Sequence, residues 1–144
     1  MYLLIYGILF LSSLKKNSKY FEGFIYKLLF VILWLFLGLR WGQGTDFFGY
    51  QYIFTHSSSW NQVVNNPYNL HSEIGFRFLC YLFHENYSLM IFFISSFEML
   101  MLYRFFKIFE SDCCLSLLLF YPTFYLTYYF SALREGIVIA IFIG

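Results

Sequence analysis

The segment Tyr87–Phe106, with the sequence YSLMIFFISSFEMLMLYRFF, decides the class of this protein. As an α-helix, with a rise of about 1.5 Å per residue, it would be about 30 Å long. The hydrocarbon core of a bilayer is also about 30 Å thick. The segment is therefore predicted to be a transmembrane helix.

The composition of the chain supports this interpretation. Of its 144 residues 60% are hydrophobic and 12% are charged, and the mean hydropathy is +0.64. A soluble domain averages about 25% charged residues. A chain of this size also has too little interior for its 21 Phe and 14 Tyr. A soluble globular domain is therefore excluded.

Charge and cysteine content exclude several other classes. The net charge of +1 comes without a basic patch, so we expect no nucleic acid partner. The three cysteines are odd in number and have no CxxC spacing, which argues against a disulfide framework or a zinc site. The histidines lack ligand spacing as well. We therefore expect no metal.

Further apolar segments flank the first one. Tyr2–Leu14 has no basic start and no small-residue cleavage site, which favours a short anchor over a signal peptide. The predicted spans are 2–14, 24–39, 87–106, 115–133 and a partial span, 136–144. Because the last span is incomplete, we expect a single transmembrane domain, 1–144, that is the N-terminal part of a longer fold.

Lysine and arginine distribution predicts the orientation of these spans. Basic residues gather at 15–27 and at 104–107, and such clusters favour the cytoplasmic side. Ile74–Phe83 would be only about 15 Å long as a helix, and a crossing there would break the parity of the other spans. The expected fold is an all-α polytopic bundle with its N-terminus outside and Ile74–Phe83 as a re-entrant or interfacial helix on the outer face.

This topology brings the charged residues of the loops to one side. We expect them at or beyond the outer membrane surface, where they can converge on one outward-facing cleft: Arg40, Asp46, Glu73, Arg77 and Arg134. Any chemistry is therefore predicted to occur on the outer face.

The stretch Gly38–Tyr50, GLRWGQGTDFFGY, carries the densest set of informative residues. Gly42 and Gly44 allow a sharp turn where the chain leaves the membrane. Thr45 or Asp46 can cap a following helix. The spacing is not GxGxxG, and a membrane helix rather than a strand precedes it, which argues against a dinucleotide-binding loop.

The same stretch offers groups for ligand binding. Arg40 has a fork of donors suited to phosphate or carboxylate, and Asp46 and Tyr50 would share one face of the following helix. The alternative is structural, with Asp46 as a helix cap and Arg40 as an anchor at the membrane surface.

Two later segments repeat this pattern of charge beside an apolar run. Glu73 would place a carboxylate near Arg40 or Arg134, or would complement the dipole of the helix that follows it. Arg134 could bind an anion, or it could belong to a hairpin turn between two spans.

Glu98 lies well inside the span 87–106. A charge at the centre of a bilayer costs about 2.5–3.5 kcal/mol on insertion scales, so such a residue faces protein or water. Glu98 could line a polar channel or be a protonated, hydrogen-bonded structural residue.

Taken together these motifs resemble the EpsG family, membrane proteins of exopolysaccharide and capsule clusters that are similar in character to the Wzy polysaccharide polymerases. The resemblance covers about Phe24 to Gly144. It rests on Arg40-x-Gly42-x-Gly44-Thr45-Asp46-x-x-x-Tyr50, Glu73-x-Gly75-Phe76 and Arg134-x-Gly136.

The resemblance implies a metal-independent membrane glycosyltransferase without a cofactor. It would join oligosaccharide repeats carried on undecaprenyl diphosphate at the outer face of the bacterial plasma membrane. Arg40 and Arg134 would hold the diphosphate, and Asp46 or Glu73 would accept the proton of the attacking hydroxyl. Tyr50 and Arg77 are further candidates for substrate binding.

The resemblance also implies partners and leaves other functions open. The expected partners are the undecaprenyl-diphosphate-linked oligosaccharide, the lipid bilayer and other polysaccharide-export proteins. Two alternatives are a transporter or flippase component for lipid-linked sugars, and a truncated remnant without activity. A transporter would need polar residues through its spans, where Glu98 is the one strong candidate.

Overall fold

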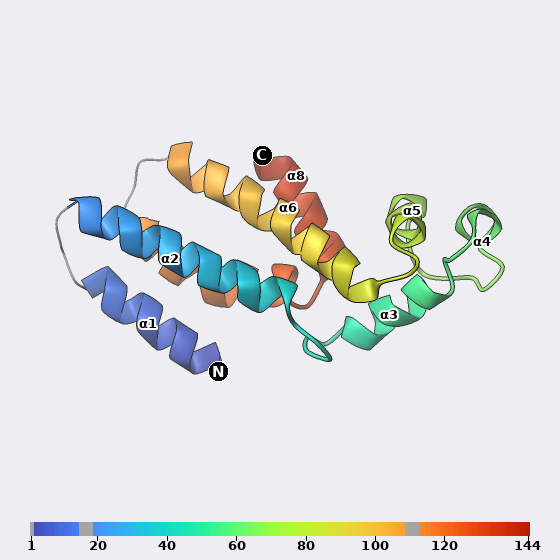
Figure 1. Ribbon diagram of the computed structural model, residues 1–144, viewed down its shortest axis with the longest axis horizontal. Helices are drawn as coiled ribbons and strands as arrows, with labels where there is room; N and C mark the ends of the chain where they lie inside the picture. The colour runs from blue at the N-terminus through green and yellow to red at the C-terminus, as the bar shows by residue number, and fades with distance from the viewer. Residues whose placement is uncertain (1, 15–18, 109–112) are drawn as a thin grey trace.

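The structure is a computed structural model that describes residues 2–14, 19–108 and 113–144 (Figure 1). Within these ranges all regular elements are helices, which confirms the all-α class. They are α1 (Tyr2–Leu14), α2 (Lys19–Gly38), α3 (Phe47–Thr55), α4 (Trp60–Asn65), α5 (Ile74–Leu82), α6 (Tyr87–Ile108), α7 (Cys113–Phe120), the π-helix η1 (Tyr121–Tyr129) and α8 (Leu133–Ile143).

The long helices pack side by side as a bundle. α6 packs against α2 and α8, and α1 packs against α7. α2 and α6 run in opposite directions, while α8 runs along α6 in the same direction (Figure 1). Leu33, Leu102 and Tyr125 are among the fully or almost fully buried residues between these helices, and Trp34 Nε1 donates a hydrogen bond of 3.0 Å from α2 to Ser96 Oγ on α6.

Within the described part of the chain, α6 alone is long and apolar enough to cross a membrane. The apolar helical segments Tyr2–Ser13 and Gly23–Gly38 are shorter. The predicted span 115–133 corresponds to α7 and η1, which form one continuous helical stretch and end at Tyr129. α8 begins at Leu133, earlier than predicted, so Arg134 lies in its first turn.

The switch from α-helix to π-helix coincides with a proline. Pro122 lies in the first turn of η1, and it lacks the N–H that would continue the α-helical hydrogen bonding. π-helical turns inside α-helices are often found at functional sites. This turn lies in the helix that leads into Arg134.

The short helices α3, α4 and α5 lie together at one end of the bundle, between the end of α2 and the start of α6 (Figure 1). α5 does not run along the bundle (Figure 1), and its position as a re-entrant or interfacial helix stays a prediction. The N-terminus belongs to this end too, because the Tyr2 hydroxyl donates to Gln43 Oε1 at 3.3 Å. The placement of this end outside the membrane stays a prediction.

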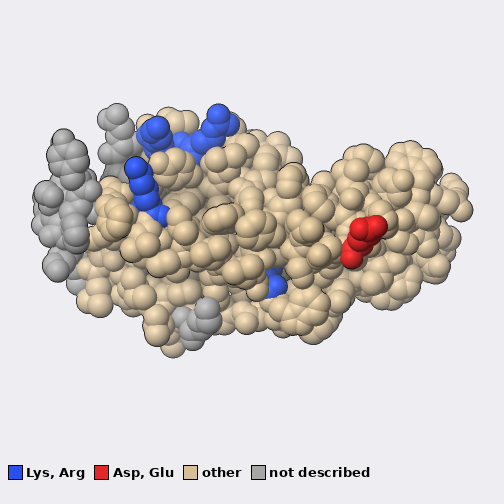
Figure 2. All heavy atoms as spheres, viewed as in Figure 1, with Lys and Arg blue, Asp and Glu red and all other residues tan. Residues whose placement is uncertain are grey.

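Most of the basic residues visible in Figure 2 gather at the opposite end of the bundle. Lys27 lies in the first half of α2, and Arg104 and Lys107 lie in the last turns of α6. Lys15 and Lys16 belong to the predicted cluster but lie outside the described residues. The described part of the chain thus separates a basic end from the end that carries α3 to α5.

Candidate functional site

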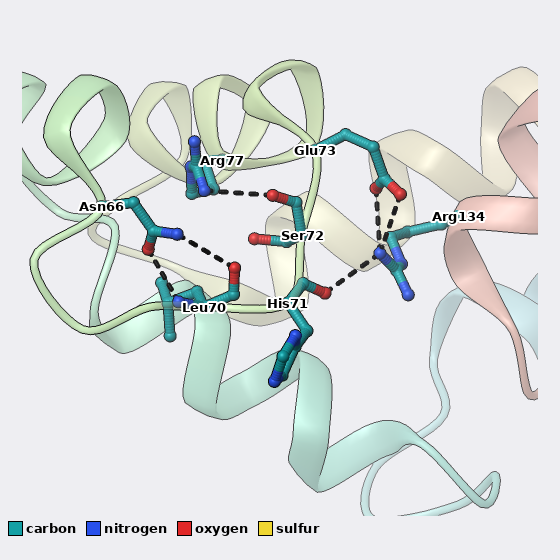
Figure 3. A network of polar contacts seen from close by, with 7 residues as sticks. All are labelled: Asn66, Leu70, His71, Ser72, Glu73, Arg77 and Arg134. Atoms are coloured by element: carbon teal, nitrogen blue, oxygen red, sulfur yellow. Dashed lines mark hydrogen bonds and ion pairs between the residues drawn. The ribbon is translucent and has the colours of Figure 1, made fainter.

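An ion pair joins the start of α8 to the start of α5. Arg134 Nη1 lies 2.9 Å from Glu73 Oε2 and 3.1 Å from Glu73 Oε1 (Figure 3). The same nitrogen donates to the His71 carbonyl oxygen at 3.2 Å. The prediction that Glu73 lies near Arg134 is therefore confirmed.

Tyr50 on α3 completes this cluster. Its ring packs against Phe76 of α5, with 5.4 Å between ring centroids, and the Arg134 guanidinium carbon lies 5.8 Å from the centroid of the Tyr50 ring. Burial raises the pKa of the Tyr50 hydroxyl. The pKa of Glu73 is lowered by its own backbone N–H and then by Arg134. Glu73 is therefore a carboxylate, and Tyr50 a neutral phenol, at neutral pH.

Glu73 and Arg134 of this cluster line a pocket of about 780 Å³ between α5, η1 and α8, whereas Tyr50 is not among its lining residues. Glu73, Arg134 and Glu135 supply the charges. The walls are mainly apolar and include Phe76, Leu79, Phe124, Tyr128, Val138 and Ile139. The pocket therefore combines an anion-binding group with a hydrophobic surface.

Arg40 follows α2 and turns inward. It is buried, with 6% of its surface exposed. Its Nη1 donates to the Tyr129 carbonyl oxygen at 3.1 Å, and its guanidinium carbon lies 5.0 Å from the centre of the Phe130 ring. Tyr129 ends η1, and terminal helix carbonyls lack partners within the helix and favour cations. Arg40 therefore caps the C-terminal end of η1.

The glycines after Arg40 allow this approach. Gly42 and Gly44 have φ angles of 63° and 97°, which confirms the predicted turn. A Cβ at Gly44 would lie 2.8 Å from the Phe130 carbonyl oxygen. The loop therefore packs directly on the turn that precedes α8.

The residues in these contacts belong to the three motifs, at Arg40–Tyr50, Glu73 and Arg134, on which the resemblance to a family rests. The model of the EpsG family matches residues 23–143 of this chain. The chain belongs to the EpsG family. No curated protein and no solved structure matches it. Family membership and the apolar helix α6 identify an exopolysaccharide-related membrane protein.

The two arginines of this EpsG-family chain line different pockets. Arg40 borders a smaller pocket of about 360 Å³, together with Trp41, Asn86 and Phe92. None of the residues described around that pocket also lines the pocket at Arg134. The expectation of one shared cleft is thus met only for Glu73 and Arg134, because the free end of η1 draws Arg40 inward.

Asp46 occupies the N-cap position of α3, as predicted, but its side chain makes no capping hydrogen bond. Its backbone oxygen accepts from the Tyr50 N–H at 2.9 Å. Asp46 is exposed whereas Tyr50 is buried, so the two side chains do not share one environment. Thr45 is exposed beside it and lines a small pocket with Gly44 and Phe130.

Arg77 is buried within the α4–α5 region of this EpsG-family chain. Its Nε donates to the Val63 carbonyl oxygen at 3.0 Å, and its Nη1 donates to the Ser72 carbonyl oxygen at 3.0 Å (Figure 3). Asn66 and Leu70 close the same loop with two further hydrogen bonds. These contacts hold the segment that leads to Glu73, so Arg77 helps to position Glu73 without lining the pocket itself.

The aromatic wall of the pocket was missed from the sequence. Phe120, Phe124 and Tyr128 follow one another along one helical face. The rings of Phe120 and Phe124 stack with centroids 5.5 Å apart, and the Tyr128 ring lies tilted against Phe124 with centroids 5.9 Å apart. Their spacing of four residues was a usable signal for such a face. Phe124 and Tyr128 line the pocket.

Proposed function

We propose that this EpsG-family protein polymerises lipid-linked oligosaccharide repeats at the outer face of the bacterial plasma membrane. The observation that carries the proposal is the pocket between α5, η1 and α8, where Arg134 and Glu73 stand at the edge of an apolar wall. A polyprenyl diphosphate has the same division into an anionic head and an apolar chain.

The two parts of the pocket suit the two parts of such a carrier. A guanidinium is always charged and can donate two parallel hydrogen bonds to phosphate oxygens. Arg134 is held in position by Glu73 and the His71 carbonyl oxygen. Its side chain therefore loses less conformational entropy when a ligand binds. Phe124, Tyr128 and Val138 provide apolar surface for the first prenyl units.

The proposed reaction is a glycosyl transfer. A hydroxyl oxygen of one repeat bonds to the anomeric carbon of another chain, the bond from that carbon to the diphosphate oxygen breaks, and the diphosphate leaves with the bonding electrons. Arg134 stabilises the charge that develops on this leaving group. Arg40 supports the site indirectly, through its contact with the Tyr129 carbonyl at the end of η1, and the proposed reaction uses no metal or cofactor.

The proton of the attacking hydroxyl needs an acceptor. Glu73 is already engaged by Arg134 and its pKa is lowered, which makes it a weaker base. Asp46 is exposed, and none of the described hydrogen bonds involves its carboxylate. The proposed acceptor is therefore Asp46 or Glu73: Asp46 is unengaged but is not among the residues that line the pocket, whereas Glu73 lines it but is paired with Arg134.

The test uses the complete protein in its native membrane, with the rate of polymer formation and the polymer length as the readouts. We expect Arg134→Gln to lower the rate of polymerisation about 10²–10³-fold, the usual cost of removing one donor to a developing charge. Arg134→Lys keeps the charge and should lose less. Arg104→Gln, at the other end of α6, is the matched control. Wild-type polymer from Arg134→Gln would overturn the proposal.

A second arm separates polymerisation from transport and tests Arg40. Vesicles are supplied with lipid-linked repeats already on the outer leaflet, where a polymerase makes polymer and a transporter makes none. Arg40→Lys should shorten the polymer, because an ammonium lacks the planar group that lies over the Phe130 ring while it donates to the Tyr129 carbonyl. Unchanged polymer with Arg40→Lys would remove Arg40 from the mechanism.

A further inference from the structure

Glu98 is a fully buried acid in the middle of α6, with 0% of its surface exposed. It faces α8, since a Cβ at Gly136 would overlap with Glu98 Oε1. Gly136 lies two residues after Arg134 in the same helix, α8. The carboxylate therefore lies directly behind the start of the helix that carries the pocket arginine.

Several buried polar groups around Glu98 lack hydrogen-bond partners among the described residues. They are both carboxylate oxygens of Glu98, Ser95 Oγ, Tyr129 OH and Arg40 Nε. Ser95 and Glu98 lie on one face of α6, three residues apart, and the charge of Glu98 acts on the Tyr129 hydroxyl. Unpaired buried polar groups are rare in native proteins and call for a specific explanation.

Arg40 supplies the charge that this acid requires. A lone charge in a low-dielectric interior is very unfavourable, and acids within a membrane helix usually have a partner. Arg40 is also buried and binds the Tyr129 carbonyl oxygen. The preceding carbonyl oxygen, that of Tyr128, and Glu98 Oε1 both lie beside Gly136, so the acid and the arginine lie at the same end of η1. No direct ion pair joins them in the described part of the chain, so their attraction acts over a longer distance than a contact.

We infer that Glu98 is the buried counter-ion of Arg40 and a positioning residue for the outer site. Its negative charge keeps the guanidinium turned inward at the end of η1, where Arg40 caps the Tyr129 carbonyl. Its contact with Gly136 fixes the start of α8. One acid thus holds the segments that present Arg40 and Arg134. Its effect on catalysis rests on the proposed function, whereas the pairing does not.

The pairing is tested by a double-mutant cycle on the complete purified protein, with the unfolding temperature as the readout. Arg40→Gln and Glu98→Gln should each lower this temperature, because each leaves one charge buried alone. The double variant should lose less than the sum of the two single losses. Glu85→Gln, an exposed acid, should combine additively with Arg40→Gln. Additive losses for Arg40 and Glu98 would overturn the inference.

Two further readouts keep the test decisive. Where Glu98→Gln fails to accumulate in the membrane, the double variant should recover accumulation, and continued absence would count against the pairing. Glu98→Asp retains the charge and should restore polymer length relative to Glu98→Gln. In the Arg40→Gln background, Glu98→Gln should shorten the polymer no further.

Failure of the inference and failure of the proposed function give different results. The unfolding cycle needs no substrate, so coupling without any polymer from the wild-type protein would refute the proposed function alone. Polymer from the wild type without coupling between Arg40 and Glu98 would refute the inference alone.

Discussion

Arg134 Nη1 and Glu73 Oε2 lie 2.9 Å apart although 61 residues separate them in the chain. The contact joins α8 to α5 across the mouth of the pocket. The side chains are 29% and 72% exposed, respectively, and ion pairs that face water contribute only about 0–1 kcal/mol. The pair therefore orients Arg134 more than it stabilises the fold.

This distinction gives the first prediction. Glu73→Gln should change the free energy of unfolding by no more than about 1 kcal/mol, yet shorten the polymer because Arg134 loses its orienting partner. Thermal unfolding and polymer length would be measured on the same preparation. Glu85→Gln, with a side chain that is 90% exposed, serves as the control and should change neither. A large loss of stability with Glu73→Gln would mean that the pair is mainly structural.

The second prediction concerns pH. The Glu73 pKa is lowered in the folded protein by its own backbone N–H and by Arg134. The pairing therefore adds stability above the unfolded-state pKa of about 4.3, and this stability is lost as the pH falls through the lower folded-state pKa. The difference in unfolding temperature between wild type and Glu73→Gln should shrink from about pH 6 to about pH 3. A difference that grows on acidification would contradict this sign.

Much of the fold followed from apolar segment lengths and charge positions. Those patterns predicted the long helices and the separate character of Ile74–Phe83, because span length and basic residues are local properties. They did not predict the π-helix, which begins where Pro122 interrupts the α-helical hydrogen bonding. They also placed the start of α8 too late, at residue 136 instead of Leu133.

The site was predictable in part for a similar reason. Charge and motif indicated Glu73 and Arg134 together, and the structure pairs them. The inward turn of Arg40 was missed, because the free carbonyl of Tyr129 that attracts it lies 89 residues away in the chain. The two backbone acceptors of Arg77, the carbonyl oxygens of Val63 and Ser72, could not be predicted either, because they depend on the loop geometry.

The third prediction separates the two turn glycines. In Gly44→Ala the added Cβ would lie 2.8 Å from the Phe130 carbonyl oxygen, and the backbone φ of 97° would be strained as well. At Gly42 the atom nearest to an added Cβ is Phe48 Cζ, at 3.8 Å. We expect Gly44→Ala to cost about 2–3 kcal/mol and Gly42→Ala about 1 kcal/mol. Thermal unfolding measures both.

Gly49 in α3 provides the matched control for these glycines. A Cβ there meets no atom within 4 Å, so Gly49→Ala should stabilise the helix by up to about 1 kcal/mol. The prediction for the turn is wrong if Gly42→Ala and Gly44→Ala cost the same.

The fourth prediction concerns the contact between α6 and α8. Gly136→Ala places a methyl group on Glu98 Oε1 in a closed space, and such overpacking costs about 1–3 kcal/mol. Glu98→Ala removes the obstructing atoms, so the loss from Gly136→Ala should be smaller in that background. Equal losses in both backgrounds would show that the neighbouring Tyr128 carbonyl oxygen, 3.3 Å from the added carbon, limits the space instead.

The fifth prediction tests the orientation of the bundle in the membrane by labelling single cysteines. Tyr68 and Glu135 are exposed and lie in the α4–α5 loop and the first turn of α8, whereas Lys107 is exposed in the last turn of α6. In a protein without its native cysteines, Tyr68→Cys and Glu135→Cys should react in intact cells with a charged maleimide that cannot cross the bilayer. Lys107→Cys should react only after permeabilisation.

The reason for this pattern is the arrangement of the helices. α2 and α6 are antiparallel, and α8 runs parallel to α6 (Figure 1), so the start of α8 and the α3–α5 region belong to the same end of the bundle. The basic residues of α2 and α6 favour the cytoplasm for the other end. Labelling of Tyr68→Cys and Glu135→Cys from opposite sides would place Glu73 and Arg134 in different compartments, which their ion pair forbids. In that case both the helix arrangement and the proposed outer-face site would be wrong.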